Sequence, residues 1–223
     1  MQTEEVRPYY EKLSRKWFSL FVKRIFDFAV SSVMLAILSP ALLVLAVMIK
    51  KDSEGPVFYR QERITQYGRK FRIYKFRTMV INADKIGSLV TVGEDPRITK
   101  MGKKLRGCRL DELPQLLNIL KGDMSLVGPR PERPELQKEI EKEVPEFGLR
   151  LQAKAGLTGY AQVYGKYNTT FYDKLLMDLM YISKPSILED FTIMLATVKI
   201  LTSKESTEGV GEGKDKLEFR ESK

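Results

Sequence analysis

The sequence contains no histidine and only one cysteine, Cys108, among its 223 residues. The absence of histidine excludes a histidine general base and a histidine-ligated metal centre. A single cysteine allows neither an internal disulfide nor a cysteine zinc cluster, which agrees with a reducing compartment. We also find no internal repeat. Catalysis or metal binding by this chain would therefore use carboxylates and cationic side chains.

Length and composition limit the architecture and the partners. With 223 residues, 43 % of them hydrophobic, the chain suffices for one domain with a real core, and a second full domain is not expected. Lys and Arg total 38 against 29 Asp and Glu, a formal net charge of +9. This charge suits anionic lipid, phosphorylated ligands or nucleic acid equally well, so charge alone does not choose among them.

A long uncharged run occupies residues 28–49. About 20 apolar residues are enough to span a bilayer as a helix. The run is too long for a cleaved signal peptide and no small-residue cleavage site follows it. Residues 1–22 mix Lys and Arg with aromatic side chains, which predicts an interfacial approach to the membrane, although a surface helix is also consistent.

Ser39 and Pro40 stand near the middle of the uncharged run. Proline deletes a backbone donor and predicts a kink or break there, where the Ser39 hydroxyl is able to bond a freed carbonyl. Basic pairs at 23–24 and 50–51 flank both ends, so the positive-inside rule gives no preferred exit side. Two interpretations follow: an ordinary kinked span, or a re-entrant helix-break-helix over residues 23–51 that returns both ends to one side.

A β-hairpin is predicted after the membrane segment. Residues 56–63 and 70–79 are rich in β-branched and aromatic side chains, and the turn signal Gln66-Tyr67-Gly68 separates them. The many cations of this hairpin either face phosphates and lipid headgroups or form a solvated surface. Residues 82–104 are predicted to be a loop, long enough to close over a substrate.

Most of the candidate catalytic residues lie in residues 105–131. Asp111 and Glu112 precede an apolar repeat whose three- and four-residue spacing predicts a short helix, formed by Leu113, Leu116, Leu117 and Leu120. Asp111 is expected to be its N-cap, with Pro114 in the first turn, where a missing N–H costs nothing. The helix N-terminus would keep a carboxylate ionised or hold a phosphate. An ordinary cap beside solvated arginines is the alternative interpretation.

Gly122 and Asp123 are predicted to end this short helix. The segment VGPRP at 127–131 then predicts a rigid turn that projects Arg130, because a proline lies on each side of the arginine. A preorganised arginine suits bidentate recognition of a phosphate or uracil, whereas a purely structural turn is the alternative.

The C-terminal third is predicted to be largely helical. The two last helices lie at the membrane interface or pack in the core, and Ser186 with Glu189 forms a capping box for the second. We predict a solvent-facing helix over 132–147 ending near Pro145, a glycine-punctuated loop over 156–165, helices over 171–182 and 186–201, and a disordered tail over 203–223.

Several of these motifs occur together in an order that resembles the small monotopic phosphoglycosyl transferases. These bacterial sugar transferases move a sugar 1-phosphate from a UDP-sugar onto a polyprenyl phosphate. The likeness covers roughly residues 20–202 and is carried by the stretch 105–131, by Lys23, Arg24 and Asp27, by YKFRTM at 74–79 and by GLTGYAQV at 156–163. Several separate motifs in one order are far more specific than any one of them.

The resemblance implies a fold and a location. The fold would be α+β and mainly helical, with a re-entrant membrane hairpin broken at Ser39 and Pro40, a small cytosolic catalytic domain over 52–202 and interfacial amphipathic helices. The protein would be monotopic in the bacterial inner membrane, with the catalytic domain on the cytoplasmic side. Several relatives carry a multispanning N-terminal region, so this chain resembles the minimal catalytic form.

The resemblance also implies catalytic roles. Asp111 is expected to be the nucleophile that forms a covalent phospho-sugar, and Glu112 is expected to position Mg²⁺ together with it. Lys75, Arg106 and Arg130 are expected to stabilise charge on the substrate phosphates.

Three further residues and the partners follow from the same likeness. Lys23 and Arg24 would meet the polyprenyl phosphate headgroup at the membrane boundary. Asp178 matches an aspartate of the family pattern and is assigned to substrate binding. The expected partners are a UDP-sugar, polyprenyl phosphate and membrane lipid, without nucleic acid; a homodimer and the identity of the sugar are left open. The alternative is a catalytically silent, membrane-tethered basic protein that binds lipid or nucleic acid or acts as a scaffold.

Overall fold

The computed structural model describes residues 17–83, 95–165 and 169–202. Helices dominate the described chain and two short pairs of strands accompany them, so the mainly helical α+β class is confirmed. The predictions for residues 1–16 and for the tail lie outside the described residues. The elements in chain order are α2 (Trp17–Asp52), β1 (Phe58–Ile64), η1 (Gln66–Gly68), β2 (Lys70–Phe76), α3 (Lys100–Gly107), η3 (Leu110–Gln115), α4 (Leu116–Lys121), β3 (Met124–Val127), α5 (Pro134–Glu143), η4 (Pro145–Gln152), β4 (Ala155–Thr158), α6 (Tyr160–Tyr164), α7 (Phe171–Ser183) and α8 (Ile187–Thr202).

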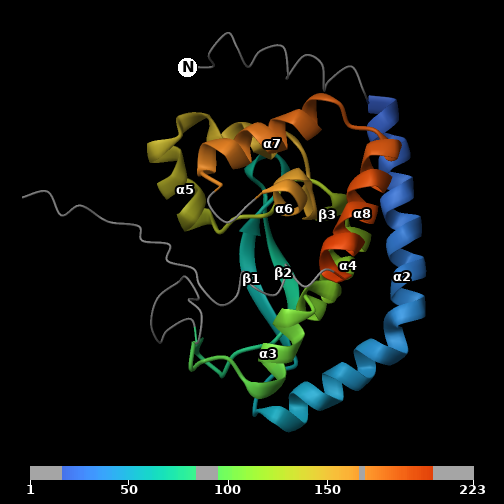
Figure 1. Ribbon diagram of the computed structural model, residues 1–223, viewed down its shortest axis with the longest axis vertical. Coiled ribbons are helices and arrows are strands. Elements are labelled where there is room, and N and C mark those ends of the chain that lie inside the picture. The colour runs from blue at the N-terminus through green and yellow to red at the C-terminus, as the bar shows by residue number, and fades with distance from the viewer. Residues whose placement is uncertain (1–16, 84–94, 166–168, 203–223) are drawn as a thin grey trace, which may run out of the picture.

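The predicted kink in the uncharged run is present. Helix α2 is continuous over 36 residues and contains Pro40, and Figure 1 shows it change direction along its second half. Pro40 has no N–H to donate to the carbonyl of Ala36, and the Ser39 hydroxyl donates to that carbonyl instead, at 2.9 Å. The chain bends here without leaving the helical conformation, so the expected break is a kink.

Most of the apolar surface of α2 faces away from the protein. Within the described ranges, α2 is the one helix long and apolar enough to cross a membrane, and only 6 % of its most hydrophobic window is buried. Side chains such as Val33 and Ile37 are 59 % and 72 % exposed. Apolar surface of this extent calls for hydrocarbon rather than water around the helix.

Both ends of α2 contact the same folded body. Near its start, Arg24 donates to the last carbonyls of α4, and Asp27 accepts a hydrogen bond from the backbone of β3. Near its end, Ile49 is buried in a small cluster with side chains of β2 and α3, and Asp52 accepts from the backbone N–H of Met101. Between these ends Val30, Met34 and Leu38 also pack against the main buried cluster. Helix α2 therefore lies along the body, and its second half turns toward α3, as Figure 1 shows.

The predicted hairpin is confirmed. Strands β1 and β2 pair antiparallel, with Phe58 opposite Phe76 and Ile64 opposite Lys70. The turn between them contains η1, where Tyr67 has a φ of 59° and Gly68 a φ of 74°. Two successive residues in the left-handed region reverse the chain within a few residues.

The predicted loop over 156–165 is wrong. These residues form β4, which pairs in parallel with β3, followed by helix α6. Gly128 and Gly156 approach so closely that a Cβ atom on either would collide with the other's backbone or that of its neighbour. The glycines that suggested a loop are needed for this close approach of two backbones.

The predicted loop over 82–104 ends earlier than expected. Helix α3 begins at Lys100, and Thr99 caps it by accepting a hydrogen bond from the N–H of Gly102 at 2.9 Å. A threonine followed by lysines is therefore a helix start that composition alone did not reveal. Residues 84–94 of this segment lie outside the described residues.

The three C-terminal helices form where they are predicted, as α5, α7 and α8. Half of the predicted capping box is present, because the Ser186 hydroxyl accepts from the N–H of Glu189 at 3.1 Å. The Glu189 carboxylate instead accepts a hydrogen bond from the Tyr160 hydroxyl of α6. A full capping box occurs at the start of α7, between Thr170 and Asp173.

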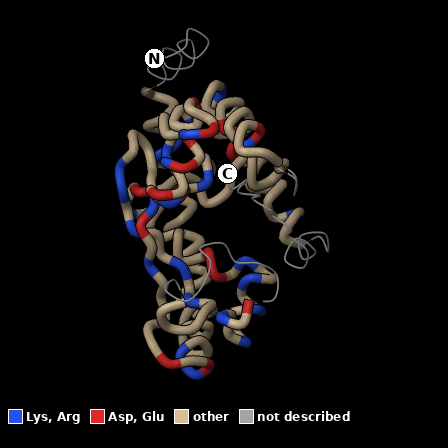
Figure 2. The backbone as a smooth tube through the Cα atoms, turned by 90° about the vertical axis from the view of Figure 1, so that its left-hand side faces the viewer, with Lys and Arg blue, Asp and Glu red and all other residues tan. Residues whose placement is uncertain are grey.

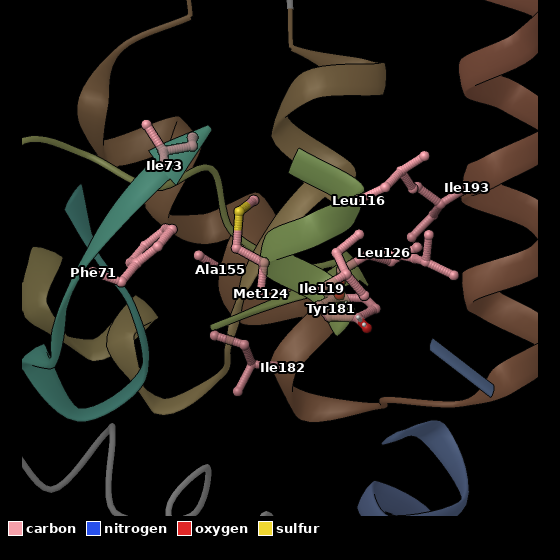
Figure 3. Close-up of a cluster of buried hydrophobic side chains, with 11 residues drawn as sticks. Phe71, Ile73, Leu116, Ile119, Met124, Leu126, Ala155, Tyr181, Ile182 and Ile193 are labelled. Carbon is pink, nitrogen blue, oxygen red and sulfur yellow. Dashed lines mark hydrogen bonds between the residues drawn. The ribbon is translucent and has the colours of Figure 1, made fainter. Parts of the chain in front are cut away.

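A buried cluster fixes the position of α4 and of the segment before it. Figure 3 shows Phe71 of β2, Leu116 and Ile119 of α4, Met124 of β3 and Ile193 of α8 packed together. Four of these five side chains are 0 % exposed. Burying such a side chain contributes about 1.5–3 kcal/mol relative to leaving it in water. The cluster thereby holds the residues that precede α4 against the hairpin.

Candidate active site

The two adjacent acids precede α4 in a separate tight turn. Asp111 and Glu112 lie in the 3₁₀ helix η3, which follows Arg109 with a φ of 52°, and α4 begins only at Leu116. The expectation that Asp111 is the N-cap is therefore wrong. The left-handed Arg109 turns the chain sharply out of α3, and the six residues after it close as a tighter helix before α4 begins.

A polar cleft of about 530 Å³ lies between the hairpin, the end of α3 and η3. All five residues predicted to act on the phosphates line it, although they come from three separate stretches of sequence: Lys75, Arg106, Asp111, Glu112 and Arg130. The structure therefore brings the expected catalytic residues together. A volume of this size is typical of small-molecule sites, which range from about 300 to 1,000 Å³.

Glu112 is held between two cations. Its Oε1 accepts from Lys75 Nζ at 2.8 Å and from Arg130 Nη2 at 2.8 Å, and its Oε2 lies 3.5 Å from Arg130 Nη1. Burial alone would raise the pKa of Glu112, but Arg130 and Lys75 more than offset this effect and lower that pKa well below its usual range. Glu112 stays ionised throughout the physiological range.

Asp111 experiences the opposite electrostatic balance. Burial raises the pKa of its carboxyl, the neighbouring charge of Glu112 raises it further, and the more distant Lys75 and Arg106 lower it by less. Asp111 lies in the first turn of η3, but burial and Glu112 outweigh the effects that lower its pKa. That a helix terminus keeps this group ionised stays a prediction. A carboxylate with a raised pKa is a stronger base and a stronger nucleophile.

Cations of the hairpin and the loops complete the cleft. Arg106 donates to the Thr78 hydroxyl at 2.9 Å, and burial lowers the pKa of Arg106 and that of Lys75. Figure 2 shows both signs in both halves of the molecule, with basic positions more frequent than acidic ones in the lower half. Four arginines that line the cleft were not predicted as site residues: Arg63, Arg77, Arg97 and Arg133.

Strand alternation would have found Arg63. Tyr59, Gln61 and Arg63 are alternate residues of β1, and all three line the cleft. Tyr59 lies directly opposite Lys75 in the hairpin, so the two side chains share one face of the sheet. Arg63, four residues after Tyr59 on the same strand, lies on that face too. Arg97 and Arg133 lie in irregular segments, where no such period exists.

An apolar groove of about 390 Å³ reaches the same carboxylate from the other side. Side chains of α2 and α8 line it, among them Met34, Phe191 and Val198, and Glu112 and Arg130 line it as well. The polar cleft and the apolar groove therefore meet at these two residues.

Residues 18–204 match the family model described as bacterial sugar transferase, and this range covers most of the chain. The chain belongs to the bacterial sugar transferase family. It is 39 % identical over 184 residues to a UDP-N-acetylgalactosamine-undecaprenyl-phosphate N-acetylgalactosaminephosphotransferase of Aeromonas hydrophila, a match that covers 81 % of this chain and 44 % of the relative.

Two further relatives of this bacterial sugar transferase are named for other sugars. A UDP-glucose:undecaprenyl-phosphate glucose-1-phosphate transferase of Caulobacter vibrioides is 40 % identical over 80 % of this chain and 69 % of its own length. An undecaprenyl-phosphate galactose phosphotransferase of Salmonella typhimurium is 35 % identical over 82 % of this chain and 41 % of its own length. The chain spans less than half the length of two of these three relatives.

The remaining predicted site residues lie away from the cleft. Asp178 of α7 is 1 % exposed and accepts from Arg150 Nε at 2.7 Å, and burial raises the pKa of its carboxyl. It joins α7 to η4 and lines neither the cleft nor the groove. Its assignment to substrate binding therefore does not agree with its position, because the motif match carried no information about burial.

Lys23 and Arg24 also have partners within the chain. Lys23 Nζ lies 2.5 Å from Asp190 Oδ2 and 3.7 Å from Asp27 Oδ1. Arg24 donates to the carbonyls of Ile119 and Leu120 at 2.6 and 2.9 Å, where the negative end of α4 favours a cation. Both residues attach α2 to the body of this bacterial sugar transferase. Their contact with a lipid phosphate remains a prediction.

The cleft offers a limited donor set for Mg²⁺. The described part of the chain contains no group of three or more metal-binding side chains. Asp111 and Glu112 supply two carboxylates, and Mg²⁺ commonly takes one or two from a protein and its other ligands from phosphates and water. Lys75 and Arg130 already contact Glu112 and compete with a metal ion for its carboxylate. The two acids therefore fit a Mg²⁺ ion whose other ligands come from a bound diphosphate. Magnesium dependence remains a prediction.

Proposed function

We propose that this protein transfers a sugar 1-phosphate from a UDP-sugar to a polyprenyl phosphate and releases UMP. One observation carries the proposal: the cation-rich cleft and the apolar groove meet at Glu112 and Arg130. A water-soluble diphosphate suits the cleft, and a lipid phosphate suits the groove. A transfer between them requires both phosphates at one place.

The donor lies in the polar cleft. Its diphosphate is attracted by the cations that line the cleft, and Arg130, whose side chain is 42 % exposed at the rim, is placed to bind a phosphate while it keeps its contact with Glu112. Mg²⁺, when bound, would neutralise diphosphate charge next to Asp111 and Glu112. The relatives' names support a UDP-sugar but differ in the sugar, so the sugar is not assigned.

The first half of the reaction forms a covalent intermediate. A carboxylate oxygen of Asp111 attacks the β-phosphorus, and the bond from that phosphorus to the bridging oxygen of the diphosphate breaks. UMP leaves with the bonding electrons, and the sugar 1-phosphate remains on Asp111 as an acyl phosphate. No proton has to be transferred, which suits a site without histidine.

The second half consumes the lipid. With its chain along the groove, the polyprenyl phosphate presents its phosphate at Arg130. A phosphate oxygen attacks the acyl phosphate, the bond to Asp111 breaks, and polyprenyl diphosphate-sugar leaves. Lys75 and Arg106 balance the charge of both phosphates in each half.

The contacts of α2 support the proposed membrane arrangement. Because both ends of α2 bind one folded body, a helix that bends at Pro40 and re-enters the same leaflet keeps these contacts, whereas a straight span would separate them. We infer a monotopic protein in the bacterial inner membrane with its catalytic body on the cytoplasmic side.

A panel of UDP-sugars mixed with the enzyme tests this proposal. With the correct sugar and no lipid, the enzyme should release about one equivalent of UMP and retain a phospho-sugar that maps to Asp111 by intact-protein and peptide mass spectrometry. Polyprenyl phosphate should then restore turnover. Asp111→Asn should form no adduct.

The competing function is a catalytically silent scaffold or a basic lipid-binding module. Such a protein would bind lipid equally well after Asp111→Asn and would release no UMP with any sugar nucleotide. Turnover that strictly requires both substrates at once, without an adduct, would retain the transferase but replace the covalent route by direct displacement.

A further inference from the structure

A small cavity, with a few charged and polar side chains in a mainly apolar wall, lies on the opposite side of β3 from the apolar groove. It has a volume of about 100 Å³ and is bounded by the start of α2, by β3 and by the residues between η4 and β4. Ser125 and Val127 of β3 line this cavity, while Leu126 lines the groove. No residue that lines it also lines the catalytic cleft, so the cavity is a separate site.

Two buried side chains of this cavity have unpaired polar atoms. Ser125 is 1 % exposed and Gln152 is 4 % exposed. The hydroxyl of Ser125 and both amide atoms of Gln152 have no hydrogen-bond partner among residues 17–83, 95–165 and 169–202. Buried polar groups are nearly always hydrogen-bonded, so a water molecule or a polar ligand in the cavity would satisfy these three atoms.

The cavity also carries excess positive charge. Lys23, Arg24 and Lys154 line it, together with the acid Asp27, and Lys23 also pairs with Asp190, which does not line it. Three cations and two acids leave one positive charge in excess. The ammonium group of Lys154 has no ion pair or hydrogen bond with any described residue. Burial lowers the pKa of Lys154, and the charge of Arg24 lowers it further. An anion in the cavity would relieve both effects.

The position of the cavity indicates the source of the anion. Leu20 of α2 lines it, and Trp17, Phe18 and Phe21 of the same helix end are 71 %, 65 % and 57 % exposed. Exposed aromatic residues at the end of an apolar helix lie at the level of lipid headgroups. The cavity therefore lies where lipid phosphates are concentrated.

We propose that this cavity binds the phosphate of an anionic phospholipid that is distinct from the lipid acceptor. The phosphate would accept hydrogen bonds from Lys154, from the Ser125 hydroxyl and from the Gln152 amide nitrogen. The Gln152 amide oxygen accepts but does not donate, so the headgroup must also supply a donor, as the glycerol hydroxyls of phosphatidylglycerol do. The lipid would join α2 to β3 and to the η4 end, and this role is independent of the proposed reaction.

Lipid binding and thermal unfolding of the full chain in a neutral detergent test the proposal. Phosphatidylglycerol, phosphatidylcholine with the same acyl chains and inorganic phosphate are the three probes, without any sugar nucleotide. Phosphatidylglycerol should be retained in native mass spectra and should raise the unfolding temperature, while phosphatidylcholine should do neither.

Two variants and a matched control locate the effect. Lys154→Gln and Ser125→Ala should each weaken phosphatidylglycerol binding, Lys154→Gln by about tenfold or more, because it loses a charge-assisted hydrogen bond. Lys184→Gln removes the same charge from an exposed lysine outside the cavity and should bind like the parent. Unfolding temperatures without lipid check that each variant is folded.

Three results would overturn the proposal. Equal loss of binding in Lys154→Gln and Lys184→Gln would indicate a general charge effect. Stabilisation by inorganic phosphate equal to that by phosphatidylglycerol would indicate a soluble anion as the ligand. Unchanged phosphatidylglycerol binding in all the variants would show that the lipid binds elsewhere and that the cavity holds only water. Because no sugar nucleotide is present, none of these results bears on the transferase activity.

Discussion

Two adjacent carboxylates have different roles because their surroundings differ. Glu112 contacts Lys75 and Arg130, which lower its pKa, whereas burial and the charge of Glu112 raise the pKa of Asp111. Pairs of titratable groups with pKa values pushed apart commonly divide nucleophilic and electrostatic roles. In the proposed reaction, this division suits Asp111 to the attack on phosphorus and Glu112 to the arrangement of charge around it.

The raised pKa of Asp111 predicts that the rate of adduct formation falls at acidic pH, and this fall is the acid limb of the pH–rate profile. Only the ionised carboxylate attacks, so the adduct rate should fall as pH drops through a pKa above the ordinary value of about 3.9. Arg106 lowers this pKa, so Arg106→Gln should move the limb to higher pH, and Arg106→Lys should keep it near its original position. Adduct formation followed by intact-protein mass spectrometry across pH measures the limb. An identical limb in both variants would contradict this assignment.

Metal removal should abolish turnover. The carboxylates of the cleft are few and one is already paired, so the charge of the diphosphate needs a hard divalent cation. EDTA should stop UMP release and Mg²⁺ should restore it, with Ca²⁺ as the control for charge alone. Full turnover in EDTA would mean that the lysine and the arginines of the cleft neutralise the diphosphate by themselves.

Asp178→Asn should weaken the fold rather than donor binding. The substitution removes the nearer carboxylate partner of Arg150, whose side chain is 3 % exposed, and leaves it with Glu132 at 3.7 Å. Loss of one member of a buried ion pair typically costs about 3–5 kcal/mol. We expect a lower unfolding temperature and an unchanged KM for the UDP-sugar. A higher KM for the UDP-sugar at an unchanged unfolding temperature would support the assignment of Asp178 to substrate binding.

At the level of single elements, α2 is the clearest case of local sequence acting on shape. Pro40 frees the carbonyl of Ala36, and Ser39 satisfies it at 2.9 Å. The bend therefore leaves no unpaired carbonyl at this position, and an unpaired carbonyl in the bilayer core would raise the free energy of the folded state.

Pro40→Ala should straighten α2, because alanine restores the backbone donor to Ala36. Spin labels at positions 33 and 47 in a Cys108→Ser background should move apart, as measured by pulsed electron spin resonance. Ser32→Ala is the matched control, since Ser32 also bonds its own helix, at the carbonyl of Phe28, but precedes no proline. An unchanged distance in Pro40→Ala would show that the contacts at both helix ends set the bend.

At the level of the whole molecule, two cavities of different character share one carboxylate and one arginine. The polar cleft lies under the hairpin, and the apolar groove lies between α2 and α8, whose outer faces are apolar. Under the proposed function, this arrangement lets the UDP-sugar enter from water and the polyprenyl phosphate enter from the bilayer.

The attachment of both ends of α2 to one body predicts a single-sided topology. Cysteines placed at Ser19 and at Glu54, in a Cys108→Ser background, should both react with an impermeant maleimide only from the cytoplasmic side of inverted vesicles. Labelling of the two positions from opposite sides would exclude the re-entrant arrangement and would require the contacts of Arg24 or Asp52 to be broken in the membrane.

The amino-acid sequence by itself determined the features that depend on near neighbours. The uncharged run of α2, its kink at Pro40, the β1–β2 hairpin and the three C-terminal helices follow from periodicity, turn residues and backbone chemistry. The grouping of the five catalytic candidates came from the resemblance of motif order, and the cleft confirmed that these residues lie together.

Only the tertiary structure decided the features that depend on distant partners. The parallel pairing of β3 and β4 needs two glycines 28 positions apart to meet, and local composition interprets glycines as loop residues. The pairing of Asp178 with Arg150, the raised pKa of Asp111 and the attachment of Lys23 to Asp190 all arise from burial between elements. Burial and long-range pairing are properties of the packed chain, and no short window of sequence contains them.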